Sequence, residues 1–285
     1  MAINQTQLID LLAEHRRQGW QGIQTPEWQR KIVLSLVQNQ EPRILRRIEP
    51  FFGLPADPVI LDLGSGIGNF VVACRQNGLR VFGVEPDRIG KGTSVTSLRI
   101  ASKRLDPSPF AAAVGEQLPF ADATFDLVVM DQVIEHVADQ RKVLAEAWRV
   151  LKPGGAMYVA WPNYLRFYES HYKVWFLPLL PKFLGALYLR LRRRDPVLLN
   201  QITYTTNSRL RKLLTMTGVS RFQDMNEADF VSKFRGQGMI SRSPKARFVR
   251  RLCAVPVLAS WVFLAASFYI RLREGGSEML AFKEA

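Results

Sequence analysis

Cysteine is scarce in this chain of 285 residues, which contains only Cys74 and Cys253. They lie far apart and outside any CxxC pair, so neither a disulfide framework nor a structural zinc site is predicted, and no metal ligand set is proposed. Residues 1–17 lack the basic-then-apolar order of a secretory signal. Internal repeats and low-complexity stretches are also absent. These absences favour a reducing, cytoplasmic setting.

Acidic residues are outnumbered, with 25 Asp and Glu against 39 Lys and Arg, which gives a formal net charge of +14. Such an excess suits an anionic partner: nucleic acid, anionic lipid or a phosphorylated substrate. Hydrophobic residues make up 47% of the chain and charged residues 22%, so a packed core is expected and wholesale disorder is excluded.

Short apolar runs alternate with helical patterns through the middle of the chain. The runs predict strands at 59–63, 80–84, 110–114, 125–130 and 156–160. Helices are predicted between them, at 69–76, in part of 89–105, and on the apolar face formed by Val143, Leu144, Ala147, Val150 and Leu151. This alternation predicts an α/β fold with a parallel sheet covered on both faces, which binds ligands beyond the carboxyl ends of its strands.

A glycine-rich loop follows the first predicted strand and opens a helix, with the sequence DLGSGIGNF at 62–70. Its glycines allow a tight turn and a close approach to a ligand. A second acid, Glu85, ends the next strand and suits the hydroxyl groups of a ribose. The dinucleotide fingerprint G-x-G-x-x-G requires a third glycine where Asn69 stands, so an NAD-dependent oxidoreductase is disfavoured.

Four segments in order resemble the motifs of class I methyltransferases that use S-adenosylmethionine (SAM). VILDLGSGIGNF at 59–70 resembles motif I, and GVEPD at 83–87 looks like motif II. The segments at 115–137 and 149–162 are similar to the signature of the group that includes ubiquinone and menaquinone methyltransferases. The resemblance covers residues 57–163 and implies a Rossmann-like, seven-stranded sheet with helices on both faces, and SAM as cofactor.

The resemblance also implies roles for individual residues. The glycine loop would pack against the methionine portion of SAM, Glu85 would hold the ribose, the loop after the third strand would border the adenine, and the residues after the fourth strand would lie near the sulfonium. Many members carry an aspartate where Val114 or Gly115 stands here, so Glu116 or backbone groups would have to contact the adenine instead. The expected cofactor-binding residues are Asp62, Gly64, Ser65, Gly66, Gly68, Glu85, Pro86, Glu116, Gln117, Leu118, Asp131 and Gln132.

Methyl transfer to an oxygen needs a base, and three side chains are candidates. His136 follows the fourth strand and His171 lies in the segment after the fifth; histidine titrates near physiological pH. Each could instead be a packing residue. Asp131 could act as a base or only as a supporting hydrogen-bond partner. His15 is expected on a helix surface.

Two apolar segments with basic flanks lie outside the motifs. Residues 172–194 are rich in aromatic residues and end in an arginine cluster, and residues 252–270 contain no charge. The second is long enough to span a membrane. However, 219–225 and 278–283 are predicted to pair in one sheet, and a single crossing between them would separate the partners. An interfacial or covering segment is therefore expected, and arginines beside apolar stretches favour a membrane surface over nucleic acid.

The chain is therefore predicted to consist of an N-terminal helical cap at 1–50, a SAM-binding core at 51–163, an apolar and basic insert at 164–205, and a C-terminal part of the core at 206–285 with an apolar insert at about 245–273. The expected function is methylation, of oxygen rather than carbon, of a lipophilic or lipid-linked small acceptor at the cytoplasmic face of the membrane. An RNA methyltransferase and a non-catalytic SAM-binding membrane scaffold are the alternatives.

Overall fold

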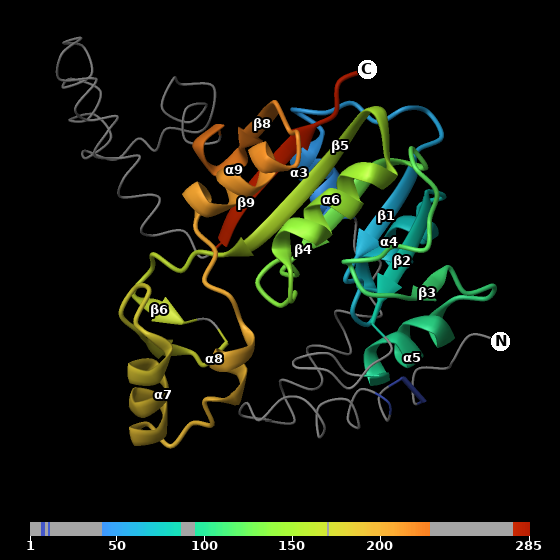
Figure 1. Ribbon diagram of the computed structural model, residues 1–285. Helices are drawn as coiled ribbons and strands as arrows, with labels where there is room; N and C mark the ends of the chain where they lie inside the picture. The colour runs from blue at the N-terminus through green and yellow to red at the C-terminus, as the bar shows by residue number, and fades with distance from the viewer. Residues whose placement is uncertain (1–6, 9–10, 12–41, 87–94, 170, 229–275) are drawn as a thin grey trace, which may run out of the picture.

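A computed structural model describes residues 7, 8, 11, 42–86, 95–169, 171–228 and 276–285 (Figure 1). Most of the expected cap at 1–50 and the apolar segment at 252–270 lie outside these residues. Within the described part, no helix is both long and apolar enough to cross a bilayer.

A seven-stranded sheet in the order β3-β2-β1-β4-β5-β9-β8 forms the centre of the molecule. Its strands are β1 Val59–Leu63, β2 Arg80–Glu85, β3 Phe110–Ala112, β4 Phe125–Asp131, β5 Leu151–Pro162, β8 Arg221–Asp224 and β9 Gly276–Phe282. The first five pair in parallel, whereas β9 runs antiparallel between β5 and β8. The predicted α/β sheet is thus confirmed, including the pairing of the last strand with the segment near residue 222.

Helices cover both faces of this sheet, as Figure 1 shows. The helices of the described part are α3 Arg43–Ile48, α4 Asn69–Gln76, α5 Val95–Arg104, α6 Gln140–Val150, α7 Lys182–Leu191, α8 Val197–Gln201 and α9 Asn207–Met216. Apolar residues of α6 and α9 pack on one face in a core that includes Leu61, Val128 and Trp161. On the other face, α3 and α4 pack against Ile60 and Leu127. Strand side chains alternate between the two faces, so the central strands β1 and β4 are buried on both.

The strand boundaries differ slightly from those predicted. The third strand ends at Ala112 rather than 114, and the fifth begins at Leu151 rather than 156. The Pro-Gly-Gly segment at 153–155 lies within β5 because the pairing register with β4 shifts between Phe125 and Leu127, and Lys283 donates from its backbone to the carbonyl of Gly155. A β-bulge of this kind accommodates Gly154, whose φ is +77°.

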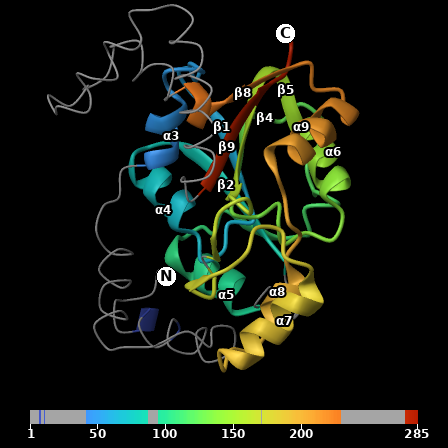
Figure 2. The same cartoon turned by 90° about the vertical axis from the view of Figure 1, so that its left-hand side faces the viewer.

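The insert after β5 is a small unit with its own apolar core. It contains the hairpin β6 Tyr168–Glu169 and β7 Val174–Trp175, followed by α7 and α8. Its core is made of Tyr164, Val174, Phe176, Leu189, Leu199 and Ile202. β5 points toward this unit, and Figure 2 shows α7 and α8 beyond the same end of the sheet. The insert therefore lies at the carboxyl edge of the parallel strands, where ligands bind in such folds.

Candidate active site

The glycine loop connects β1 to α4 through three residues in the left-handed region, Gly64, Gly66 and Gly68. A side chain at Gly64 would meet Val133 at 2.5 Å, and one at Gly68 would meet Phe110 at 2.5 Å. Gly66 differs, because no atom in the described part of the chain lies within 4 Å of the position that a Cβ would take. The two outer glycines therefore pack the loop, whereas the middle one borders open space that a ligand could fill.

Three of the expected carboxyl groups meet on one side of the sheet at this loop. Asp62 and Glu85 are buried at the ends of β1 and β2, and Asp131 is exposed at the end of β4. Burial, followed by the charges of Asp131 and Glu85, raises the pKa of Asp62 to about 8. Burial also raises the pKa of Glu85, although its Oε2 accepts a hydrogen bond of 2.9 Å from the backbone of Gly66. A positively charged ligand would relieve the repulsion among these groups.

Arg104 of α5 holds the glycine loop from outside. Its Nη1 donates to the carbonyl of Ile67 at 2.8 Å and to Oδ1 of Asn69 at 2.7 Å. Burial lowers the pKa of Arg104 to about 10. Asn69, the residue that departs from the dinucleotide fingerprint, thus has a structural partner that sequence reasoning did not identify. Pro86 follows β2 and is half-buried.

The loop expected at the adenine follows β3 and borders the start of α6. Gln117 is exposed and Leu118 is buried. Oε1 of Glu116 accepts backbone hydrogen bonds from Ala138 at 3.0 Å and Asp139 at 3.2 Å. Much of the hydrogen-bonding capacity of Glu116 is thus used within the protein, which favours backbone groups as the adenine contacts. Val114 is exposed at the same edge.

A second polar cluster lies beyond β4 and joins the core to the insert. It consists of Glu135 and His136 after β4, and of Glu169 and His171 in the β6–β7 hairpin. The two imidazole rings are perpendicular, with centroids 5.6 Å apart. Nδ1 of His171 donates to Oε1 of Glu169 at 2.7 Å, and Oε2 of Glu169 accepts from the backbone of Tyr172 at 2.7 Å. The structure thus brings together the two predicted histidines and adds two carboxylates that were not predicted.

The pKa values of Glu135, His136 and His171 are shifted in different directions. Glu135 is fully buried, and burial raises its pKa to about 7. Burial and the neighbouring His171 lower the pKa of His136 to about 4. Burial also disfavours charge on His171, but the hydrogen bond to Glu169 and the negative charges of Glu169 and Glu135 together outweigh burial and raise the pKa of His171. Titratable neighbours with opposed shifts are typical of acid–base sites.

Buried hydrogen bonds fix the position of the histidine cluster relative to the core and to the insert. Nε2 of Gln140 donates to the carbonyl of Ile134 at 2.8 Å and to Oγ1 of Thr205 at 2.7 Å, and Thr203 donates from its backbone to the carbonyl of Glu135 at 2.7 Å. These bonds join the segment after β4 to the segment after α8, which are far apart in the sequence. No local sequence pattern could have placed Glu135 beside the insert.

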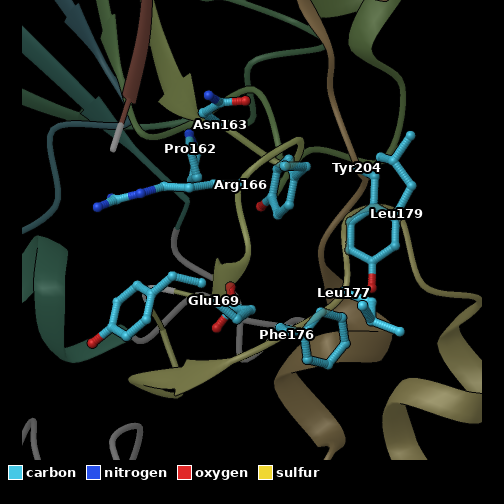
Figure 3. A pocket seen from close by; sticks show the side chains of 10 residues that line it. Pro162, Asn163, Arg166, Glu169, Phe176, Leu177, Leu179 and Tyr204 are labelled. Carbon is cyan, nitrogen blue, oxygen red and sulfur yellow. The ribbon is translucent and has the colours of Figure 1, made fainter. Parts of the chain in front are cut away.

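A pocket opens between the carboxyl end of β5 and the insert (Figure 3). Glu169 lies on its wall and links it to the histidine cluster. The hydroxyls of Tyr164 and Tyr204 are buried here without a hydrogen-bond partner in the described part of the chain. The lining is completed by Pro162, Asn163, Arg166, Tyr168, Phe176, Leu177 and Leu179. This mixture of aromatic walls and unpaired polar atoms suits a small organic ligand. The glycine loop is not part of the pocket, so the two form separate subsites.

Residues 61–159 match the family model of a methyltransferase domain. An uncharacterized methyltransferase of Mycobacterium leprae (strain Br4923) is 34% identical over 119 residues, which cover 41% of this chain and 42% of that protein. The ubiquinone biosynthesis O-methyltransferase of Rhizobium rhizogenes (strain K84) is 35% identical over 104 residues, 36% of this chain and 41% of its own length. The chain thus matches about two fifths of these relatives' length.

Solved structures show a similar fold. The [4+2]-cyclase SpnF aligns with a TM-score of 0.50 and 16% identity, over 100% of this chain and 97% of its own. Phosphoethanolamine N-methyltransferase 2 of Haemonchus contortus, solved with S-adenosyl-L-methionine, aligns with a TM-score of 0.50 and 17% identity, over 88% of this chain and 56% of its own. At these identities the likeness establishes the fold and not the reaction.

The residues around the glycine loop fit SAM. Its sulfonium and ammonium groups are positive, and the loop gathers Asp62, Glu85 and Asp131. The Oγ of Ser65 is buried without a hydrogen-bond partner in the described residues, and the space above Gly66 is open. The family match and this chemistry agree: the core of the chain is a class I methyltransferase domain that uses SAM.

Proposed function

We propose that the protein transfers a methyl group from SAM to an oxygen atom of a lipophilic or lipid-linked small acceptor at the cytoplasmic face of a membrane. The observation that carries the proposal is the pocket at the carboxyl edge of the sheet. One wall holds Glu169, which is hydrogen-bonded to His171, and the insert that forms its other walls has an exposed apolar surface.

SAM supplies an activated methyl group on a positively charged sulfur, so the protein has mainly to position the two reactants. The glycine loop and Glu85 would hold the cofactor from one side. Asp131 and Gln132 stand at the end of β4, between the loop and the histidine cluster in the sequence, and Gln132 is fixed by a 2.9 Å backbone bond to Ala160. An acceptor in the pocket would approach from the insert side.

His171 is the proposed proton acceptor for an acceptor hydroxyl. Its Nδ1 is occupied by Glu169, so Nε2 is the nitrogen available to a substrate. Glu169 is buried and itself held by Tyr172, which fixes the ring. Glu169 is thus a positioning residue. His136 has no carboxylate in hydrogen-bond contact within the described structure, since its Nε2 lies 3.8 Å from Glu135, and it is the weaker candidate.

The acceptor is proposed to be lipophilic because α7 exposes an apolar face. Phe183 is 73% exposed, Leu187 53% and Leu191 76%, and their spacing places them on one side of the helix. Arg190, Arg192 and Arg193 are exposed at its end. Trp175 and Leu177, which precede α7 in the insert, are also exposed, at 76% and 58%, and Leu177 lines the pocket. Apolar residues beside arginines suit the boundary between acyl chains and anionic headgroups.

The first test compares flotation of the full-length protein with anionic and with neutral liposomes. Changing Phe183, Leu187 and Leu191 together to Gln should abolish flotation with anionic vesicles. Met216→Gln is the control, because Met216 is 48% exposed on α9, a helix that lies away from α7 in Figures 1 and 2. Equal flotation of the triple variant and the control would refute the membrane surface.

The second test measures methyl transfer from radiolabelled SAM into a membrane lipid extract and into bulk RNA. Label in the lipid fraction supports the proposal, and label in RNA supports the alternative. Glu169→Gln should lower kcat at least tenfold and leave the affinity for S-adenosylhomocysteine unchanged, because Glu169 lies in the acceptor pocket. Loss of both would indicate that the change disrupts the fold instead.

A further inference from the structure

Glu135 presents an unusual problem in the described structure. It is fully buried, yet neither oxygen of its carboxyl group has a hydrogen-bond partner in another described residue. Buried polar atoms are nearly always satisfied, so unpaired ones at one place indicate a missing partner.

The donor atoms of this cluster converge. One atom from each of Glu135, His136 and His171 lies within 4.8 Å of the others. The distance from Oε1 of Glu135 to Nε2 of His136 is 3.8 Å. A cation about 2.1 Å from each ligand holds them roughly 3 to 4 Å apart, so small side-chain rotations would complete the set.

The hydrogen bond to Glu169 prepares His171 for the same role. Because Nδ1 donates to that carboxylate at 2.7 Å, the ring is oriented and Nε2 keeps its lone pair. Metal-binding histidines commonly donate their other nitrogen to a carboxylate in this way. Glu169 is held in turn by the backbone of Tyr172 at 2.7 Å. Two histidines and one carboxylate form a donor set that suits divalent transition metals and leaves coordination positions open.

We propose that Glu135, His136 and His171 bind a divalent transition-metal ion, with Glu169 orienting His171. The site lies beside the acceptor pocket, which Glu169 lines. An acceptor hydroxyl that occupies an open position would lose its proton to solvent more readily, because the cation stabilises the oxyanion. In the loaded protein the cation would then replace the free imidazole as the group that activates the acceptor. Only this last step rests on the proposed function.

The proposal is tested by metal binding, without any methyl acceptor. Full-length protein is freed of metal with a chelator, and Zn²⁺ is titrated calorimetrically. Co²⁺ serves as a second probe, because its visible absorption reports coordination geometry. We expect one ion per chain. Glu135→Gln and His171→Ala should each weaken binding at least a hundredfold, and Glu169→Gln should weaken it roughly tenfold to a hundredfold. His15→Ala, which changes the remaining histidine of the chain, should leave binding unchanged.

Each outcome has a definite meaning. Absence of stoichiometric binding in the wild type, or binding that survives in both Glu135→Gln and His171→Ala, overturns the proposal. Binding of S-adenosylhomocysteine is measured on every variant to identify misfolding. If Glu135→Gln fails to fold, His171→Ala decides alone, since His171 lies in the hairpin and is only partly buried. Metal binding without methyl transfer to any extract would uphold this inference and count against the proposed function.

Discussion

Gly66→Ala gives a sharp test of the cofactor subsite, because the new methyl group meets no atom of the described residues within 4 Å. Its cost to folding therefore comes from the backbone alone. Gly66 has φ +52°, and a residue with a Cβ in the left-handed region costs roughly 1–2 kcal/mol. For a chain of this size that corresponds to a fall in Tm of about 2–8 °C, taking about 2–4 °C per kcal/mol.

Gly78→Ala is the matched control. Gly78 has φ +78°, and among the described residues no atom lies within 4 Å of its Cβ position either. However, it precedes β2 and lies at the opposite edge of the sheet from the glycine loop. Both variants should lose similar stability. Only Gly66→Ala should weaken cofactor binding, by roughly tenfold to a hundredfold, since crowding a packed site costs about 1–3 kcal/mol.

The assay is calorimetric titration with S-adenosylhomocysteine and with NAD, alongside thermal unfolding of both variants. The wild type should bind the first ligand and not the second. If Gly66→Ala binds S-adenosylhomocysteine as tightly as Gly78→Ala does, the open space above Gly66 is not the cofactor site, and the reasoning from the glycine loop fails.

Three further predictions concern the supports of the site. Asp62 lies beside Glu85, Asp131 and Cys74, and its pKa is raised to about 8, so its carboxyl group is protonated at pH 7. The affinity for S-adenosylhomocysteine, which carries an ammonium group, should therefore rise with pH up to about 8 and then level off. In Asp62→Asn this pH dependence of the affinity should disappear. In the unliganded wild type the free energy of unfolding should fall as pH rises from about 4 to 8, because the folded state keeps a proton that the unfolded state releases. Arg104→Met should weaken S-adenosylhomocysteine binding several-fold, because it removes the hydrogen bond to the carbonyl of Ile67. Lys103→Met, at the exposed neighbouring position, should leave binding unchanged. Equal affinities of the two variants in the titration would refute this role of Arg104. Asp139→Ala removes an N-cap that accepts from the backbones of residues 141 and 142, so Tm should fall by about 2–4 °C with cofactor affinity unchanged.

The cofactor half of the site could be predicted because its determinants are local in sequence. A strand, a glycine turn and a helix follow one another within 59–76, and the structure reproduces this order as β1, the loop and α4. Asp62 and Glu85 end adjacent parallel strands, in which Asp62 pairs with Gly83. Parallel pairing brings the ends of successive strands to one edge, so a sequence pattern suffices to place these groups together.

The acceptor half could be predicted only in part, because its determinants are not local. His136 and His171 stood out individually, but nothing in their spacing indicated that a hairpin would bring their rings to 5.6 Å. Glu135 was not singled out in the sequence, because no local pattern indicates that its carboxyl group is fully buried. The same holds for Thr205, whose hydroxyl joins Gln140 across 65 positions of sequence. Such contacts depend on how the insert docks, and a single sequence does not encode that in any short pattern.

The sheet topology strengthens the argument about the apolar segment at 252–270, although its own placement lies outside the described residues. Asp224, the end of β8, pairs with Met279 near the start of β9, and Gly276 pairs with Pro162 at the end of β5. The chain therefore leaves the sheet after β8 and returns to it before β9 at the same edge, where the insert and its apolar helix face also lie. A segment that crossed a bilayer once could not return to this edge. The proposed membrane surface therefore requires only the exposed apolar face of α7, and it leaves the pairing of β8 with β9 intact.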